Sequence, residues 1–376
     1  MARENKGLSA AKLAKNDEFY TQYSDIQKEI NAYLEYNPDT FRGKTVLCPC
    51  DDPEWSNFTK FFAQNFQMLG LKKLISTSYS ANSKATKYNA PVEQFHQLTL
   101  FELEDALYDK EKSINRGKIF TLDHNSDNSG VINIENLKWS YLEGDGDFRS
   151  DEVTKLRDEA DIIVTNPPFS LFRDFLEWIT EADKKFMVIG NINCITYKEV
   201  FALIKSNKAW LGNGMGRWIS GFIVPEHYNL FGTEARIENG QRIVATNNCL
   251  WLTSIDHGRR HQPLQLMTMA DNLKFSKHKV IREQGYPYYD NYKAIEVPYT
   301  DAIPEDYTEV MGVPITFMDK YNPDQFEIIG CSDNGAVPEE YKLPHFKKHN
   351  EPYINGKKVY KRIFIRGKIN ANDIKN

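Results

Sequence analysis

The residues with the clearest potential for chemistry are Asn166, Pro167, Pro168 and Phe169, which follow the apolar run 162–165. An apolar run that ends in a polar loop is typical of a buried strand whose carboxyl end borders a ligand site. The two prolines fix φ and remove two backbone donors, which leaves a stiff loop that presents oxygen acceptors. In the alternative interpretation the tetrapeptide only ends a strand, because Asn and Pro are common in turns.

An acceptor array of this kind suits an aromatic exocyclic amine, whose lone pair is delocalised into the ring. If the side-chain oxygen of Asn166 and the carbonyl oxygen of Pro167 each accept one amine hydrogen, the lone pair turns toward an electrophile such as a methyl sulfonium. Phe169 would stack on the face of an extruded base, an interaction that contributes ~1–3 kcal/mol per base. The motif therefore predicts methyl transfer to the amine of a nucleobase.

The elements expected around this loop alternate between helices and strands. Apolar side chains recur at three- and four-residue intervals over 17–34, which predicts a helix. Further helices are expected at 55–69, 171–179 and 197–206, and strands at 45–48, 74–77, 119–122, 162–165, 186–189 and 249–255. Short apolar runs that alternate with helices predict an α/β fold with a mostly parallel, doubly wound sheet that is buried on both faces.

Composition is that of a folded globular protein, with 41% hydrophobic and 26% charged residues in a chain of 376. No apolar run approaches the ~18 residues that a membrane span needs, and no secretory signal is recognisable, so we expect a cytoplasmic protein without a membrane partner. The five scattered cysteines indicate neither a disulfide framework nor a metal site. We expect a flexible basic arm at 1–16, a catalytic domain at 17–255 and a Pro- and Tyr-rich region at 256–376.

The net charge of −5 means that contact with nucleic acid requires a local basic surface. Between Lys342 and Lys368 the sequence has nine Lys and Arg residues against the single acid Glu351. The candidates for phosphate contact in this stretch are Lys357, Lys358, Lys361 and Arg362. The alternative interpretation is a solvated hairpin with charged faces.

Two other basic segments are candidates for contact with DNA. Arg259 and Arg260 lie in the run 257–261, which is otherwise interpreted as an exposed turn. Arg217 follows the glycines of 212–216 and could border an extruded base, while a plain flexible connection is the alternative.

The sequence also resembles a known family. Asn-Pro-Pro followed by an aromatic residue is similar to the catalytic motif of nucleic-acid amino-methyltransferases, and 17–22 and 146–148 resemble cofactor segments of their DNA adenine class. The stretches 48–53, 56–58 and 166–173 resemble the EcoRI modification methylase family, with similarity continuing into 286–297 and 312–317. The resemblance implies a Rossmann-like core that uses S-adenosylmethionine and a C-terminal DNA-recognition region. It also implies N6 methylation of an adenine flipped out of double-stranded DNA by a monomer, with a possible cognate restriction endonuclease acting separately.

The same resemblance implies the residues that bind S-adenosylmethionine: Tyr20, Thr21, Pro49, Cys50, Asp51, Tyr79, Asp147 and Phe148. The usual Gly-rich loop after the first strand is absent, and Asp51–Glu54 stand in its place. Asp51 or Asp52 would bind the ammonium or a ribose hydroxyl of the cofactor, or would instead cap the helix expected at 55–69. Tyr79 has a simple core position as its alternative.

Two other functions are left open by the sequence. The same chemistry can act on an amine of RNA or of a protein glutamine, although such enzymes usually keep the Gly-rich loop. A catalytically silent DNA-binding relative is the second alternative. The mechanism predicted from the motif requires neither a metal nor a covalent enzyme intermediate.

Overall fold

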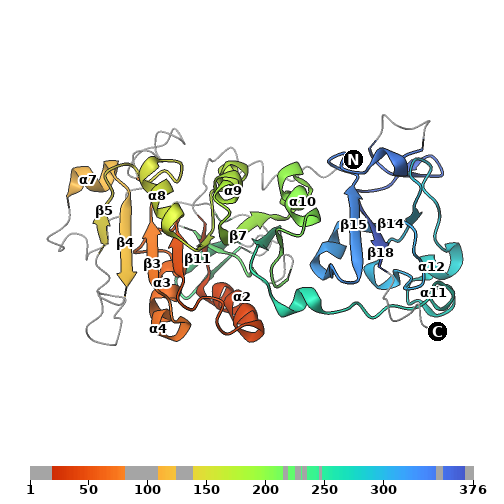
Figure 1. Cartoon of the computed structure of the whole chain (residues 1–376), viewed down its shortest axis with the longest axis horizontal. Helices are drawn as coiled ribbons and strands as arrows, with labels where there is room; N and C mark the ends of the chain where they lie inside the picture. The colour runs from red at the N-terminus through yellow and green to blue at the C-terminus, as the bar shows by residue number, and fades with distance from the viewer. Residues whose placement is uncertain are drawn as a thin grey trace. The chain divides into compact units, whose positions relative to one another are not determined.

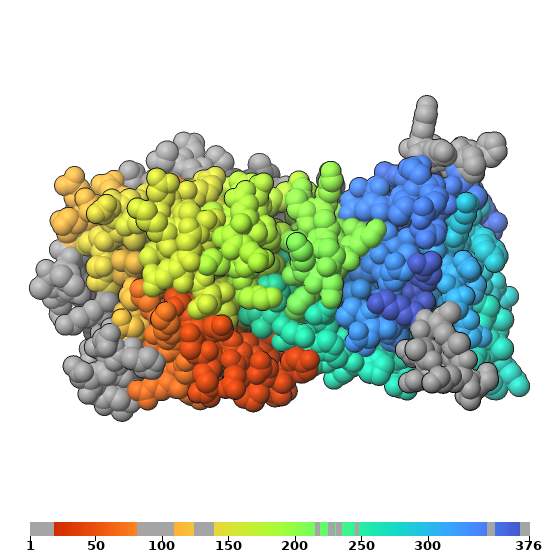
Figure 2. All heavy atoms as spheres, viewed as in Figure 1, coloured from red at the N-terminus to blue at the C-terminus, as the bar shows by residue number. Residues whose placement is uncertain are grey.

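The computed structural model describes residues 19–80, 109–123, 139–214, 219–224, 230, 235–244, 248–343 and 350–368, and Figures 1 and 2 colour these residues along the chain. The arm expected at 1–16 and Arg217 lie outside the described residues. The chain divides into two compact units. The first comprises the chain as far as Ile192 together with Gly212–Ile255, and the second comprises Asn193–Leu211 and the chain from Asp256 onward.

The first unit is built on a mixed sheet whose strands follow the order β5-β4-β3-β2-β6-β7-β12. Their bounds are β2 (Thr45–Cys48), β3 (Lys73–Thr77), β4 (Lys118–Asp123), β5 (Trp139–Tyr141), β6 (Ile162–Thr165), β7 (Lys185–Asn191) and β12 (Cys249–Thr253). The pairs β3-β2, β2-β6 and β6-β7 are parallel, whereas β4, β5 and β12 pair antiparallel. The expected α/β class is confirmed, but parallel pairing is confined to the four central strands.

Helices of the first unit largely follow the predicted apolar periods. Their bounds are α2 (Tyr23–Tyr36), α3 (Asn57–Gln64), α4 (Phe66–Leu69), α7 (Lys110–Asn115), α8 (Asp151–Glu159), the short 3₁₀ helix η3 (Phe169–Leu171) and α9 (Phe172–Glu181). The helix expected at 55–69 begins later, because Ser56 caps it by accepting from the Phe58 amide at 3.0 Å. It is also broken at Asn65, and Gly70 ends α4 with a φ of 62°.

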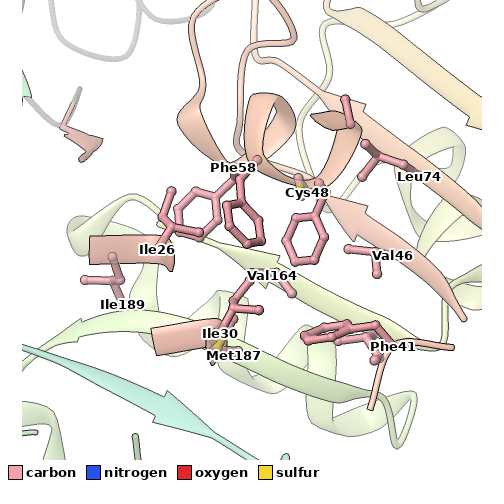
Figure 3. Packing of buried hydrophobic residues seen from close by; sticks show 14 of the residues in the cluster. Ile26, Ile30, Phe41, Val46, Cys48, Phe58, Leu74, Val164, Met187 and Ile189 are labelled. Atoms are coloured by element: carbon pink, nitrogen blue, oxygen red, sulfur yellow. The ribbon is translucent and has the colours of Figure 1, made fainter. Parts of the chain in front are cut away.

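The core of the first unit lies between the sheet and helices α2 and α3. Every second residue of the central strands faces these helices, and the cluster drawn in Figure 3 contains Ile26, Ile30, Phe58, Val46, Cys48, Val164, Met187 and Ile189. The intervening residues Leu47, Ile163 and Val188 are also fully buried. Because side chains alternate along a strand, the sheet is buried on both faces, and each buried aliphatic side chain stabilises the fold by about 1.5–3 kcal/mol.

A small antiparallel sheet in the first unit was not predicted from the sequence. Its strand order is β1-β9-β11-β10, with β1 (Tyr20–Thr21), β9 (Phe222–Val224), β11 (Gln241–Val244) and β10 (Arg236–Glu238). Tyr20 pairs with Ile223 and Thr21 with Phe222. The helix expected at 17–34 begins at Tyr23 in the described residues, because Tyr20 and Thr21 belong to strand β1.

The second unit contains a smaller sheet of order β13-β14-β18-β15. Its strands are β13 (Ile295–Glu296), β14 (Met311–Pro314), β15 (Phe326–Cys331) and β18 (Arg362–Gly367). Strands β16 (Tyr353–Ile354) and β17 (Lys357–Lys358) form a separate two-stranded hairpin, and β8 (Trp210–Leu211) belongs to the same unit. The helices are α10 (Lys198–Lys205), α11 (Met269–Phe275) and α12 (Lys279–Gln284), with 3₁₀ turns η5 (Gly258–His261), η6 (Thr300–Ala302), η7 (Ile315–Lys320) and η8 (Glu339–Tyr341). The predicted helix 197–206 is thus confirmed as α10.

Three further observations bear on the sequence predictions. In the part of the chain that the structure describes, no helix is long and apolar enough to cross a membrane. The described residues also contain no cluster of three or more His, Cys, Asp or Glu side chains that could hold a metal ion. All five cysteines are within the described ranges, and none of them forms a disulfide.

Candidate active site

Asn166 lies immediately after the central strand β6, and its side-chain amide is held in one orientation. The amide nitrogen Nδ2 donates to the carbonyl oxygen of Phe19 at 2.8 Å. The amide oxygen Oδ1 is buried and has no hydrogen-bond partner among the described residues. An unpaired buried acceptor costs roughly 1–3 kcal/mol, so this oxygen is suited to accept from a ligand.

The prolines and Phe169 complete the loop. The carbonyl oxygen of Pro168 accepts from the Leu171 amide at 2.9 Å, and Pro167 is buried. Phe169 opens the 3₁₀ helix η3 and is half-buried. Its ring centroid lies 5.9 Å from that of Phe19 and 6.3 Å from that of Phe222. The open acceptor Oδ1 of Asn166 and a partly exposed aromatic ring therefore lie at the carboxyl end of β6.

The segment after β2 is held by the side chain of Asp51. One carboxyl oxygen accepts from the Ser56 hydroxyl at 2.7 Å and the other from the Thr165 hydroxyl at 2.5 Å. Burial raises the pKa of Asp51 to about 7, against the opposing effect of these two donors. Ser56, and neither Asp51 nor Asp52, is the cap of α3. The helix-cap alternative for the two aspartates is therefore wrong.

The segment around Asp51, which stands where a Gly-rich loop would be expected, is held by side-chain contacts. The Thr77 hydroxyl donates to the carbonyl of Pro49 at 3.1 Å, and the Ser76 hydroxyl donates to the carbonyl of Asp51 at 2.6 Å. Farther along, Glu54 forms a largely buried ion pair with Lys118. These contacts fix Pro49, Cys50 and Asp51 at the carboxyl ends of β2 and β3.

Thr21 supplies a second buried polar atom of the first unit that lacks a partner. Its hydroxyl is buried with no hydrogen-bond partner among the described residues. Its carbonyl oxygen accepts from Nδ2 of Asn57 at 2.8 Å, which ties β1 to the first turn of α3. Because Phe19 is bonded to Asn166, strand β1 carries Tyr20 and Thr21 next to the 166–169 loop.

Asp147 and Tyr79 lie on two segments that meet beyond β3. Gly146 has a φ of 81°, and a Cβ there would lie 2.0 Å from the carbonyl oxygen of Ser78, so only glycine permits this close approach. Asp147 accepts from Arg149, with the Nη2 atom of Arg149 2.7 Å from Oδ2. This bond raises the pKa of the Arg149 guanidinium, and Tyr79 contributes in the same direction. Tyr79 and Asp147 therefore lie beyond the carboxyl end of β3, on segments that the contact between Ser78 and Gly146 brings together.

Phe148 occupies a different environment from the other predicted cofactor residues. Its ring is 4% exposed and packs against Phe175 and Trp178 of α9, at centroid distances of 5.0 and 5.5 Å. This ring stabilises the contact of α9 with the 145–148 segment. Contact between Phe148 and a cofactor stays a prediction.

Comparison with known proteins now places this arrangement in a family. The profile described as "Adenine-specific methyltransferase EcoRI" matches residues 7–368. The chain belongs to this family. It is 45% identical over 371 residues to the type II methyltransferase M.EcoRI of Escherichia coli, covering 98% of this chain and 99% of that protein. It is 33% identical over 366 residues to M.MgeORF184P of Mycoplasma genitalium, covering 96% and 98%, respectively. No solved structure matches the chain.

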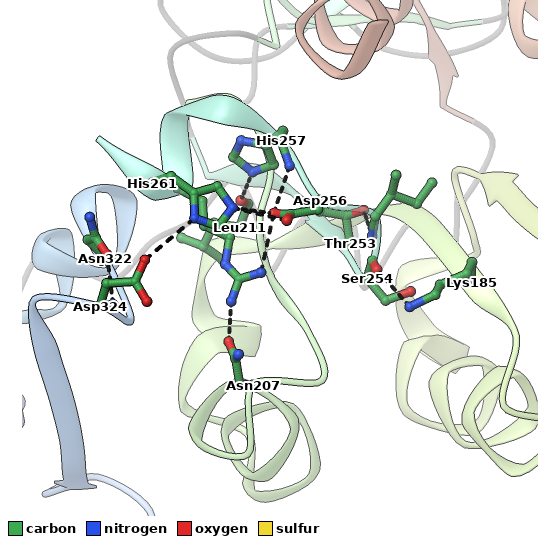
Figure 4. A network of polar contacts seen from close by, with 12 residues as sticks. Lys185, Asn207, Leu211, Thr253, Ser254, Asp256, His257, His261, Asn322 and Asp324 are labelled. Atoms are coloured by element: carbon green, nitrogen blue, oxygen red, sulfur yellow. Dashed lines mark hydrogen bonds and ion pairs between the residues drawn. The ribbon is translucent and has the colours of Figure 1, made fainter. Parts of the chain in front are cut away.

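In an adenine-specific methyltransferase, basic segments are candidates for contact with DNA. The side chains of Arg259 and Arg260 in the run 257–261 are instead bonded to other residues of the second unit. The Arg260 guanidinium is 7% exposed, lies 3.6 Å from the ring centroid of Trp210 and contacts Asn207 and Asp256. Figure 4 shows Asn207 and Asp256 together with the bond from the ring of His257 to the carbonyl of Leu211. Arg259 is paired with Asp319 at 2.6 Å. The run is thus a 3₁₀ turn held by the second unit, and the exposed-turn alternative is wrong for the buried Arg260.

The basic stretch near the end of the chain is divided between exposed and buried side chains. Lys357 and Lys358 are exposed on the hairpin β16–β17, whose turn residues Asn355 and Gly356 have φ values of 50° and 72°. Lys361 is half-buried and pairs with Asp333 at 2.7 Å. The hairpin alternative is therefore confirmed as the local structure, and phosphate contact stays a prediction.

Arg362 is directed into the second unit. It donates to both carboxyl oxygens of Glu296, with Nε 2.9 Å from Oε2, and Tyr289 donates to the same carboxylate. The side chains of Arg362 and Glu296 are 11% and 7% exposed. The buried pair accounts for Arg362 without any DNA contact.

Several residues of the site were not found from the sequence. Phe19 and Phe222 complete the aromatic cluster around Phe169, and Thr165 and Ser56 hold Asp51. Thr165 had a usable signal, since a hydroxyl residue that ends an otherwise apolar buried strand needs a partner. Phe19 acts through its backbone carbonyl and had no such signal.

Proposed function

We propose that the chain is a site-specific methyltransferase that modifies N6 of adenine in double-stranded DNA with S-adenosylmethionine. The observation that carries this proposal is the open Oδ1 atom of Asn166, fixed by the Phe19 carbonyl beside the half-buried ring of Phe169. An adenine amine offers two hydrogens in the plane of its ring. Oδ1 of Asn166 and the carbonyl of Pro167 are the matching acceptors.

The chain's own residues perform three tasks in this reaction. Asn166 and Pro167 accept hydrogen bonds from the amine and so raise the nucleophilicity of N6, while Pro168 keeps the loop stiff. Phe169 stacks on the flipped base and offsets part of its unstacking cost. Placing the amine in line with the methyl donor supplies much of the remaining acceleration.

The cofactor assignment fits the residues at the ends of β2 and β3. The unpartnered buried hydroxyl of Thr21 needs a polar ligand, and Tyr79 and Asp147 offer acceptors near the same strand ends. We assign the binding of S-adenosylmethionine to these residues with Tyr20, Pro49, Cys50 and the 147–148 backbone, while the side chain of Asp51 holds the 49–51 segment in place. When bound, S-adenosylmethionine supplies the electrophilic methyl group. The first unit is then a Rossmann-like methyltransferase core.

The second unit is proposed as the DNA-recognition region. Its exposed lysines Lys357 and Lys358, with Lys361 beside them, are suited to contact phosphates. Arg259 and Arg217 are further candidates, whereas Arg260 and Arg362 act inside the second unit. The corresponding biological role is to protect DNA in the cytoplasm. The protein would act as a monomer, with or without a separate restriction endonuclease.

The test is methyl transfer from labelled S-adenosylmethionine to genomic DNA that lacks adenine methylation, followed by nucleoside analysis and mapping. N6-methyladenine confined to one short motif supports the proposal, and Asn166→Ala serves as the inactive control with cofactor binding retained. Label in RNA or in protein glutamine instead of DNA would assign the chemistry to another amine. Binding of DNA without any transfer would indicate a silent relative.

A further inference from the structure

Asp51 connects the carboxyl ends of three strands in the first unit. It follows β2, its backbone nitrogen donates to the carbonyl of Thr77 in β3 at 3.0 Å, and its carboxyl group accepts from Thr165, the last residue of β6. The other carboxyl oxygen accepts from Ser56 at 2.7 Å. Asp51 is 6% exposed, and Ser56 and Thr165 are 1% and 0% exposed.

A carboxyl group in this position is costly for the fold. Burial disfavours its charged form, and the charge of Asp52 acts in the same direction. Two hydroxyl donors compensate only in part, which is why the pKa of Asp51 is raised to about 7. Stability alone would favour a neutral side chain here, so the carboxyl group calls for a functional explanation.

The partner of that carboxyl group provides the explanation. Thr165 precedes Asn166 in the chain, and its hydroxyl is bonded to Oδ2 of Asp51. Asn166 is held from its other side by the Phe19 carbonyl. The backbone of the catalytic loop is therefore anchored at Thr165 and its side chain at Phe19.

We infer that Asp51 is a positioning residue, whose bond to the Thr165 hydroxyl fixes the backbone that presents Oδ1 of Asn166 and the carbonyl of Pro167. This inference rests on the proposed function and deepens it. It means that the segment at Asp51, which stands in place of the Gly-rich loop, helps to align the amine for methyl transfer. Asp51 then affects the rate of methyl transfer through Thr165. Its removal would leave the affinity for the cofactor largely intact.

The decisive comparison uses two isosteric changes at neighbouring strand ends. Thr165→Val removes the bond to Asp51, and Thr77→Val removes a bond from an equally buried threonine to Pro49 in the same segment. For each protein we would measure the single-turnover rate of methyl transfer at pH 8, the dissociation constant for S-adenosylmethionine and the melting temperature. The rate of methyl transfer by the wild-type protein tests the proposed function. The ratio of each variant's rate to the wild-type rate tests the positioning role.

Thr165→Val is expected to lower the single-turnover rate about tenfold to a hundredfold, the effect of losing a hydrogen bond to a charged group. The cofactor affinity should stay within about twofold, and Thr165→Ser should restore the rate because it returns the hydroxyl. Asp51→Asn should lower the rate by a similar factor. In the double variant Thr165→Val with Asp51→Asn, the loss of rate should be far smaller than the two single losses combined. With S-adenosylmethionine at saturation, Thr77→Val should keep a rate near that of wild type at a comparable loss of stability, because its hydroxyl is bonded to Pro49 and leaves the bond between Asp51 and Thr165 in place.

Two results would overturn the inference. A normal rate in Thr165→Val would show that the bond does not align the loop. Loss of cofactor affinity in Asp51→Asn at an unchanged rate under saturating S-adenosylmethionine would assign Asp51 to the cofactor site instead. A wild-type protein that transfers no methyl group to DNA would reject the proposed function itself, which is a separate outcome.

Discussion

Asn166 and Phe19 are joined by a hydrogen bond of 2.8 Å from the side-chain amide nitrogen to the backbone carbonyl, across 147 positions of the sequence. Because a carbonyl oxygen can only accept, the amide nitrogen must face Phe19 and the amide oxygen must face away. The segment before α2 thus sets the direction of the acceptor that the proposed reaction uses. This relationship distinguishes asparagine from aspartate at the site.

Replacing Asn166 with aspartate is the first test of that distinction. In Asn166→Asp a carboxylate oxygen would face the Phe19 carbonyl, and the two oxygens would repel each other. Methyl transfer should therefore fall strongly at pH 8 and recover in part toward pH 6, where a protonated carboxyl group can donate to Phe19. Single-turnover rates over this range check the prediction. Asn166→Ala should be inactive at every pH, and an Asp variant with the wild-type rate at pH 8 would refute the role of the bond.

Phe169 should control the capture of the flipped base. Phe169→Leu keeps much of the apolar packing against Phe19 and Phe222 but removes the aromatic face. We expect a smaller fluorescence increase from 2-aminopurine at the target position, because a lost stacking contact costs about 1–3 kcal/mol. Phe169→Tyr is the matched control and should retain the signal. Equal fluorescence changes in the Leu variant and wild type would remove the stacking role.

The local parts of the fold could be predicted from the sequence, and the long-range parts could not. Strands β2 and β6 have the expected bounds, because short apolar runs between polar turns leave little ambiguity. The helix expected at 55–69 was wrong in detail, since Asn65 bonds back to the Phe61 carbonyl at 2.8 Å and interrupts it. The pairing of Thr21 with Phe222 joins segments about two hundred residues apart, and no local pattern reports such a contact.

The candidate site shows the same division. The motif predicted the acceptor of Asn166 because its chemistry is contained in four consecutive residues. The basic runs were less informative, since charge in a sequence does not show which way a side chain points. Arg260 and Arg362 turn inward to Asp256 and Glu296, whereas Lys357 stays exposed.

Arg362 should therefore matter for stability. Arg362→Ala would leave the carboxylate of Glu296 buried without its cation, a change that typically costs about 3–5 kcal/mol. Urea unfolding should show this loss of unfolding free energy. The double variant Arg362→Met with Glu296→Leu should recover much of the stability, because it removes the unpaired charge. An Arg362→Ala protein as stable as wild type would contradict the buried-pair interpretation.

Lys357 should matter for DNA and not for stability. Its side chain is exposed beside the turn of the β16–β17 hairpin, so Lys357→Ala should change the unfolding free energy by no more than about 0.5 kcal/mol. If Lys357 contacts a phosphate, the variant should bind DNA more weakly, and the slope of log affinity against log salt should decrease by about 1. Lys279→Ala, at another exposed lysine of the second unit, is the control. An unchanged slope would exclude Lys357 from the interface.

Asp51 should give the folded protein a measurable dependence of stability on pH. Its folded pKa of about 7 lies above that of an unfolded aspartate, about 3.9, so the folded state binds the extra proton between these values. The stabilisation is complete at the acid end and is lost as the pH rises to 7. The unfolding free energy of wild type minus that of Asp51→Asn should therefore fall by about 1.4 kcal/mol per pH unit from 4 to 7. Asp52, Cys48 and Cys50, which lie near the carboxyl group, are common to both proteins and largely cancel. A flat difference would show that Asp51 stays ionised when buried.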